Sequence, residues 1–225
     1  MRLAVIIPTL DAADGLAVRM CELDGEWVIV SDGGSGDGTL AAALAGGAVL
    51  ASGSKGRGQQ LRRGAHRAML DSRPPDWMLF LHADTALPEG WRGGVEAHAA
   101  RSNKAAAFAF GAQGKGAKLM GAMVRLRELC WGLPYGDQGL LIPRDLYERV
   151  GGFAPMALFE DVDMVERLRA VQGRLVRLPA QVTTDISAHQ RDGVWKRGWR
   201  NLGLLRAYRR GVPVEELLAR YRSRP

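Results

Sequence analysis

The sequence predicts an α/β fold in which a mostly parallel central sheet is flanked by helices. Short apolar runs alternate with helix-like segments, and each pair occupies about 25 residues, as in βαβ units. The clearest run is residues 78–81, which follows Pro74-Pro75 and ends in His82-Ala83-Asp84. A continuous apolar run with these limits is typical of a central strand that is covered on both faces.

The first third of the chain contains four predicted strands and three predicted helices. Pro8 ends the first strand, a Gly-rich turn follows the second, and a basic loop, residues 52–58, follows the third. The predicted strands are residues 2–8, 26–30, 48–51 and 78–81, and the predicted helices are residues 12–21, 39–45 and 59–70.

The pattern then becomes less regular. Residues 115–130 read as an amphipathic helix whose apolar stripe favours core packing over a membrane or partner face. The further predicted helices are residues 91–101, 144–150, 161–172, 195–210 and 214–221, and the further strands are residues 105–110, 137–143 and 174–178. A length of 225 residues fits one α/β domain, residues 1–190, with a helical extension, residues 191–225, packed on it.

Charge is distributed unevenly along the chain. Residues 191–225 hold ten basic and three acidic residues, so this tail carries the entire net charge of +7 and residues 1–190 are balanced. A basic tail is suited to anionic partners such as lipid headgroups. Its apolar residues equally fit packing across the domain, with the arginines solvated.

Cysteine content and hydropathy predict a cytoplasmic protein. Cys21 and Cys130 are far apart and have no metal-binding spacing, which is typical of a reduced compartment. The N-terminal apolar run is too short for a signal peptide, and no run approaches the ~20 residues of a membrane span. A peripheral position at the inner membrane face remains an alternative because of the basic tail.

Asp84 is a candidate ligand or metal residue. Crevices in open α/β sheets form at the carboxyl ends of the strands, and a carboxylate there is costly unless it is paired or holds a cation. The alternative has equal weight from this segment alone: Asp84 caps the next helix or turns the chain before Pro88.

Two further segments have the composition of a nucleotide-binding crevice. In residues 30–39, VSDGGSGDGT, Asp32 could accept a hydrogen bond from a base or ribose, although the segment also fits a plain turn. It matches neither a dinucleotide fingerprint nor a P-loop. Lys55 and Arg57 precede a predicted helix start, where a diphosphate could bind, although a solvated basic loop is the commoner outcome.

An acidic cluster occurs at another predicted helix start. Glu160, Asp161 and Asp163 follow the apolar Leu158-Phe159. Acids are common at helix starts, but a carboxylate beside other carboxylates has a raised pKa and can serve as a general base.

Taken in order, these motifs resemble the family 2 glycosyltransferases of the GT-A fold. The resemblance covers about residues 2–178 and is most similar to a short bacterial branch found beside radical-SAM or selenium-related genes. Its motifs are VIIPTLD, VSDGGSGDGT, GRGQQLRRGA, LFLHADT, YGDQGLLIPRDLYERVGGF and LFEDVDMVERL.

The resemblance implies a role for each matching position on the donor side. Pro8, Asp11 and Asp32 would surround the nucleoside, and Arg57 would approach the diphosphate. Asp84 would hold a divalent cation, Mn²⁺ or Mg²⁺, that bridges the two phosphates.

On the acceptor side, the resemblance makes Asp161 the general base, with Glu160 beside it in the substrate site and Asp137 lining the acceptor. The chain departs from the family pattern at His82, which replaces the first Asp of a DxD motif. Histidine suits Mn²⁺ better than Mg²⁺, so His82 could instead bind a ribose or a phosphate. Leu10-Asp11 replaces an Asn-Glu pair, and Arg62 or Arg63 replaces an asparagine.

The sequence therefore predicts a metal-dependent inverting glycosyltransferase of hexosyltransferase type. Its donor would be a nucleotide-diphospho-sugar, and its acceptor could be small or lipid-linked. Two alternatives remain open: a nucleotidyltransferase of similar fold, and a non-catalytic module that binds nucleotide sugars. Nucleic-acid binding is not expected, because the tail contains no recognisable nucleic-acid module.

Overall fold

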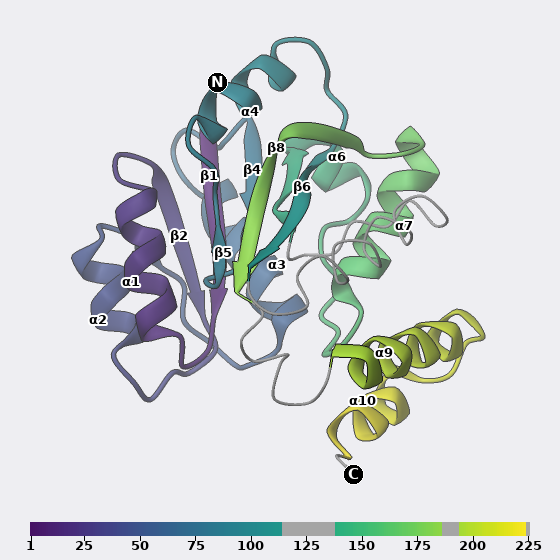
Figure 1. Cartoon of the computed structure of the whole chain (residues 1–225). Coiled ribbons are helices and arrows are strands. Elements are labelled where there is room, and N and C mark those ends of the chain that lie inside the picture. The colour runs from purple at the N-terminus through teal and green to yellow at the C-terminus, as the bar shows by residue number, and fades with distance from the viewer. Residues whose placement is uncertain (114–137, 186–193, 224–225) are drawn as a thin grey trace.

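The structure is a computed structural model, and it describes residues 1–113, 138–185 and 194–223. Within these residues an eight-stranded mixed sheet has the order β3-β2-β1-β4-β7-β6-β8-β5 (Figure 1). The strands are β1 (Leu3–Thr9), β2 (Trp27–Asp32), β3 (Val49–Leu50), β4 (Trp77–Phe80), β5 (Thr85–Ala86), β6 (Ala106–Gln113), β7 (Leu140–Pro143) and β8 (Val176–Asp185). The predicted α/β fold with a mostly parallel sheet is confirmed.

Four neighbouring strands form the parallel part of the sheet. β1 pairs in parallel with both β2 and β4, and β2 pairs in parallel with β3. β4 is central, as predicted, but it is antiparallel to β7 on its other side. β6 and β8 pair in parallel, while β7 and β5 run antiparallel to their neighbours.

Helices cover both faces of this sheet. They are α1 (Ala13–Glu22), α2 (Thr39–Ala45), α3 (Arg57–Met69), α4 (Trp91–Ala99), α6 (Arg144–Arg149) and α7 (Glu160–Gln172), followed by the tail helices α9 (Val194–Arg209) and α10 (Val214–Arg222). Along β1, Leu3, Val5 and Ile7 face the core on the side of α1, α2 and α4, whereas Ala4 and Ile6 face α3, α6 and α7. The continuous apolar strands predicted from sequence therefore bury both faces.

Several predicted boundaries are wrong by a few residues. β1 continues through Pro8 to Thr9, α3 begins at Arg57 rather than two residues later, and α7 begins at Glu160. β5 was not predicted, and β8 continues seven residues beyond the predicted strand end at 178. The predicted helix 115–130 and the predicted domain boundary at residue 190 lie outside the described residues.

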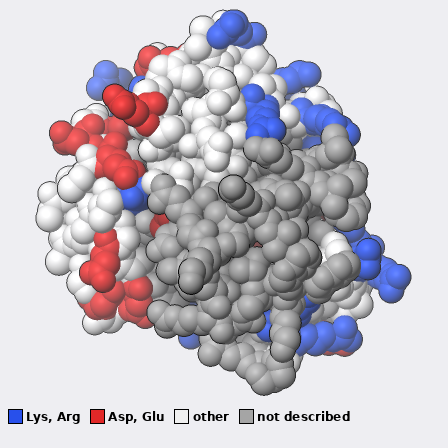
Figure 2. Space-filling view, in the orientation of Figure 1, with Lys and Arg blue, Asp and Glu red and all other residues white. Residues whose placement is uncertain are grey.

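The tail helices lie side by side beneath α7 (Figure 1). Leu205 of α9 is buried in a cluster with Val162 and Val165 of α7. In Figure 2, acidic side chains gather over α1 and α2, while Lys and Arg predominate on the opposite side. In the described part of the chain, no helix is both long enough and apolar enough to cross a membrane.

Candidate functional site

The carboxyl ends of β1, β2 and β4 bring three predicted segments to one edge of the sheet. Thr9 is in register with Asp32, and Pro8 lies beside Ser31. The Leu81 N–H donates to the Ile6 carbonyl at 3.0 Å, so residues 82–84 follow directly at the same edge. Open α/β sheets bind ligands at this edge.

The buried carboxylate of Asp32 organises the Gly-rich loop. Oδ1 accepts hydrogen bonds from Thr9 Oγ1 at 3.1 Å and Ser35 Oγ at 2.5 Å, and Oδ2 accepts from the N–H groups of Gly34 and Ser35. Burial raises the pKa of Asp32, but these hydrogen bonds outweigh burial and leave the pKa below its ordinary value. Both oxygens are therefore engaged, and a ligand N–H would have to replace one of the loop donors.

Asp11 ties the loop after β1 to the loop after β2. Its backbone is left-handed, with φ 48°, and its Oδ1 accepts from the Gly36 N–H at 2.8 Å. Its own N–H donates to Ser35 Oγ at 2.9 Å. The exposed Asp11 side chain therefore lies over the same loop that Asp32 holds from within.

Two residues of α3 that the sequence analysis did not assign to the site fix this helix against the strand ends. Gln60 donates from Nε2 to the carbonyls of Thr9, at 2.6 Å, and Ser31, at 3.1 Å. Arg63 donates from Nη2 to the Asp32 carbonyl at 2.6 Å and from Nε to the Ala51 carbonyl at 3.0 Å. Nothing in the local pattern distinguishes them from other polar residues of a helix, because their partners lie far away in sequence.

The N-terminus of α3 meets the N-terminus of α7. Arg57 Nε lies 3.7 Å from Glu160 Oε1, and Arg57 is half exposed whereas the Glu160 side chain is 4% exposed. Gly58 makes this approach possible, because a Cβ at this position would lie 2.3 Å from the Ala154 carbonyl oxygen. The predicted diphosphate residue and the predicted acidic cluster are thus brought together.

Glu160 carries a strongly perturbed carboxyl group in this cluster. Burial raises the pKa of Glu160 to about 7, with a further increase from the charge of Asp161 and a smaller opposing effect of Arg57. Asp161 is half-buried, and its Oδ1 accepts from the Val162 N–H at 2.8 Å. The first turn of α7 therefore presents two carboxyl groups in different environments, which is a common arrangement for proton transfer.

His82 also belongs to this group. It is half-buried, and burial together with the charge of Arg57 holds the pKa of its imidazole well below the ordinary value. The imidazole is therefore neutral at pH 7, which leaves one ring nitrogen able to accept a hydrogen bond or bind a metal.

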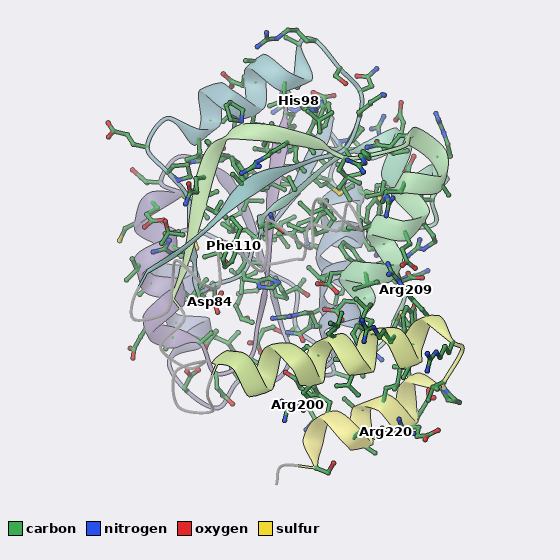
Figure 3. The ribbon with its side chains drawn as sticks, turned by 45° about the vertical axis from the view of Figure 1, so that its right-hand side comes forward. Asp84, His98, Phe110, Arg200, Arg209 and Arg220 are labelled. Atoms are coloured by element: carbon green, nitrogen blue, oxygen red, sulfur yellow. The ribbon has the colours of Figure 1, made fainter. Side chains whose placement is uncertain are left out.

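Asp84 lies at the lower end of the sheet in Figure 3. Its carboxylate is exposed and accepts one long hydrogen bond, at 3.4 Å, from Thr85 Oγ1. Among the described residues, no group of three or more His, Cys, Asp or Glu side chains could enclose a metal. Asp84 suits a cation that is shared with substrate, since Mg²⁺ sites commonly combine one or two carboxylates with phosphate oxygens.

One predicted site residue, Asp137, lies outside the described residues. Its neighbour Gln138 is buried and donates from Nε2 to the Phe108 carbonyl at 3.3 Å. Gly139 has φ 62° and packs against the Phe108 ring, so this segment enters the core directly before β7.

Models of known protein families do not match the sequence, and neither do curated proteins. Solved structures do match. A mycobacterial protein superposes with a TM-score of 0.56 at 22% identity, covering 82% of this chain and 65% of its own. A mannosyltransferase from Pyrobaculum calidifontis, in complex with GDP-Man and Mn²⁺, superposes with a TM-score of 0.61 at 16% identity. The match covers 92% of this chain and 61% of the mannosyltransferase.

Glucosyl-3-phosphoglycerate synthase from Mycobacterium tuberculosis, in complex with Mn²⁺, UDP and glucosyl-3-phosphoglycerate, gives a TM-score of 0.61 at 16% identity. That match covers 94% of this chain and 81% of the synthase. The chain thus spans less than two thirds of the length of the first two structures. Together these likenesses show that the chain has the fold of GT-A glycosyltransferases.

Proposed function

We propose that the chain is a metal-dependent inverting glycosyltransferase that moves a sugar from a nucleotide-diphosphate donor to an acceptor hydroxyl. The convergence of Arg57, His82 and Glu160 at the carboxyl edge of a GT-A sheet carries this proposal. Their segments are predicted, respectively, to approach the diphosphate, to hold the cation and to receive the acceptor proton. Two structures with this fold were solved with Mn²⁺ and a nucleotide or nucleotide sugar.

The reaction would proceed by a single displacement at the sugar. The acceptor oxygen forms a bond to the anomeric carbon as the bond from that carbon to the diphosphate oxygen breaks. Asp161 takes the hydroxyl proton, and the nucleoside diphosphate leaves with the electron pair. Arg57 stabilises the charge that develops on the diphosphate. A cation on Asp84 would neutralise part of the same charge.

Glu160 and Asp161, two of the acidic residues of α7, would then have different roles. Asp161 is half-buried and has access to an acceptor, whereas Glu160 is buried and holds its proton up to about pH 7. Protonation of Glu160 removes its charge from the first turn of α7, which also holds the carboxyl groups of Asp161 and Asp163. Mutual repulsion of adjacent carboxylates favours this division.

A donor screen tests the proposal. The chain would be incubated with UDP-, GDP- and dTDP-sugars and Mn²⁺, while thermal shift reports binding and mass spectrometry reports the released nucleotide. Binding with slow release of nucleoside diphosphate is expected. Binding without release under any acceptor condition would favour a non-catalytic module, and release of pyrophosphate from a nucleoside triphosphate would favour a nucleotidyltransferase.

We also propose that residues 191–225 are an extension of a GT-A domain rather than a separate unit, since α9 packs on α7. The burial of Leu204 and Leu205 uses part of the apolar surface that an interfacial helix would need. A lipid-linked acceptor and a cytoplasmic position at an anionic membrane remain predictions from the basic tail. Flotation with anionic vesicles tests them, and the absence of binding would exclude the membrane contact.

A further inference from the structure

The first turn of α7 starts from a strained residue. Phe159 is the N-cap of α7 and has φ 65°, and in the described residues only one other non-glycine residue, Asp11, has a positive φ. A bulky side chain is disfavoured in this left-handed region, and Phe159 makes no side-chain capping hydrogen bond. Such a conformation persists only where neighbouring structure holds it.

Phe159 packs against apolar residues of its own helix and of the tail. Its ring lies against the Tyr208 ring of α9, with centroids 5.0 Å apart and planes inclined by 32°. Next to it, Leu205 of α9 is buried with Val162 and Val165 of α7.

One turn further along α7, Arg209 forms an ion pair with Glu166, with Nη2 2.8 Å from Oε1. Figure 3 shows Arg209 where α9 passes α7. The contacts between α7 and α9 therefore run from the N-cap of α7 to its second turn.

We propose that α9 is a positioning element for the reaction and that Tyr208, acting through Phe159, fixes the direction of Glu160 and Asp161. This inference rests on the proposed function, in which Asp161 removes the acceptor proton. Tyr208 itself does not touch the reacting atoms. Without its ring, Phe159 could relax to a negative φ, and the peptide that leads into Glu160 would turn away from Arg57.

The arginines of the tail differ in their contacts with α7. Arg209 forms the ion pair with Glu166, whereas Arg206 and Arg210 are exposed and Arg220 pairs with Glu216 within α10. The conformational role is therefore assigned to the apolar side of α9, while exposed arginines such as Arg206 and Arg210 are suited to solubility or an anionic partner.

The test compares Tyr208→Ala with Tyr208→Phe and Tyr208→Leu in the full chain. Tyr221→Ala is the matched control, because the Tyr221 ring of α10 lies under Arg200 of α9, away from the Phe159 contact. Amide hydrogen exchange over residues 158–166 reports the first turns of α7 without requiring activity. Nucleotide release gives kcat and the donor KM.

Tyr208→Ala is expected to raise exchange in this segment by about 2- to 10-fold, the amount that one aromatic pair contributes to a local opening equilibrium. It is also expected to lower kcat by up to ~10²-fold with an unchanged donor KM, because misplacement of a reacting group acts on the chemical step. Tyr208→Phe should show the exchange rate and the kcat of the wild type. Tyr208→Leu should show an exchange rate and a kcat between those of the wild type and Tyr208→Ala.

Unchanged exchange in both Tyr208→Ala and Tyr208→Leu would overturn the inference, as would an equal loss of kcat in Tyr221→Ala. A failure of this inference can be distinguished from a failure of the proposed function. A wild-type chain that releases no nucleotide from any donor would refute the glycosyltransferase proposal, while the exchange data would still show whether α9 holds the first turn of α7.

Discussion

Arg57 Nε lies 3.7 Å from Glu160 Oε1, and this contact joins the first turn of α3 to the first turn of α7. The two residues are more than a hundred positions apart in sequence. Burial raises the pKa of Glu160 and the charge of Arg57 lowers it, so the protonation of this carboxyl group depends on where the guanidinium lies. A diphosphate that drew Arg57 away would favour the neutral form of Glu160.

The pH dependence of stability should reveal Glu160. Its pKa is raised to about 7 in the folded protein, from an ordinary value of 4.5. The folded state binds more protons between these values, so the free energy of unfolding falls as pH rises through this window, by on the order of 3 kcal/mol at most. The contribution of Glu160 to the free energy of unfolding is therefore complete below pH 4.5 and lost above pH 7.

Glu160→Gln removes this titration. We expect the variant to match the wild type at pH 4 and to be more stable at pH 8, as measured by urea unfolding at both pH values. A stability difference that is the same at both pH values would contradict the raised pKa. Arg57→Gln should move the loss of stability to higher pH, since it removes the group that lowers this pKa.

Asp161→Asn should separate chemistry from binding. Loss of a general base typically costs ~10²–10⁴ in rate, while the contacts proposed for the nucleotide at the strand ends would remain. Single-turnover transfer and calorimetric nucleotide binding measure the two effects. Near-normal turnover by the variant would rule out Asp161 as the base.

Asp84→Ala should remove the Mn²⁺-dependent part of nucleotide binding. The carboxylate is exposed and makes one weak hydrogen bond, so the substitution should change the free energy of unfolding by less than about 0.5 kcal/mol. Calorimetry with and without Mn²⁺ measures the effect, and Glu89→Ala is an exposed control nearby in sequence. Identical Mn²⁺ dependence in wild type and Asp84→Ala would remove Asp84 from the metal site.

Gly58→Ala should weaken the junction between α3 and α7. The new Cβ would meet the Ala154 and Met156 carbonyl oxygens at 2.3 and 2.7 Å, and no side-chain rotation can relieve a clash with backbone. We expect a loss of about 1–3 kcal/mol in the free energy of unfolding.

The control for this substitution is Gly93→Ala in α4. A Cβ there has no neighbour within 4 Å, so the change should stabilise by about 0.5–1 kcal/mol through helix propensity. Equal effects of the two substitutions in thermal or urea unfolding would show that the close approach at Gly58 has no energetic consequence.

Two strand ends of the candidate site follow from the sequence because their signals are local. An apolar run that stops at His82-Ala83-Asp84, and another that stops at Asp32, identify two strand ends. Parallel βαβ connections then bring those ends to one edge of the sheet. The fold class needed no further information, whereas the roles of Asp32 and Asp84 came from the family resemblance and stay predictions.

The tertiary structure decided which polar groups support one another. Gln60 and Arg63 bind strand-end carbonyls, burial raises the pKa of Glu160, and the Tyr208 ring of the tail lies against Phe159, whose backbone is left-handed. Each effect depends on burial or on a partner far away in the chain. Periodicity and spacing describe only what a residue's near neighbours impose, whereas these contacts arise when separate helices pack against one another.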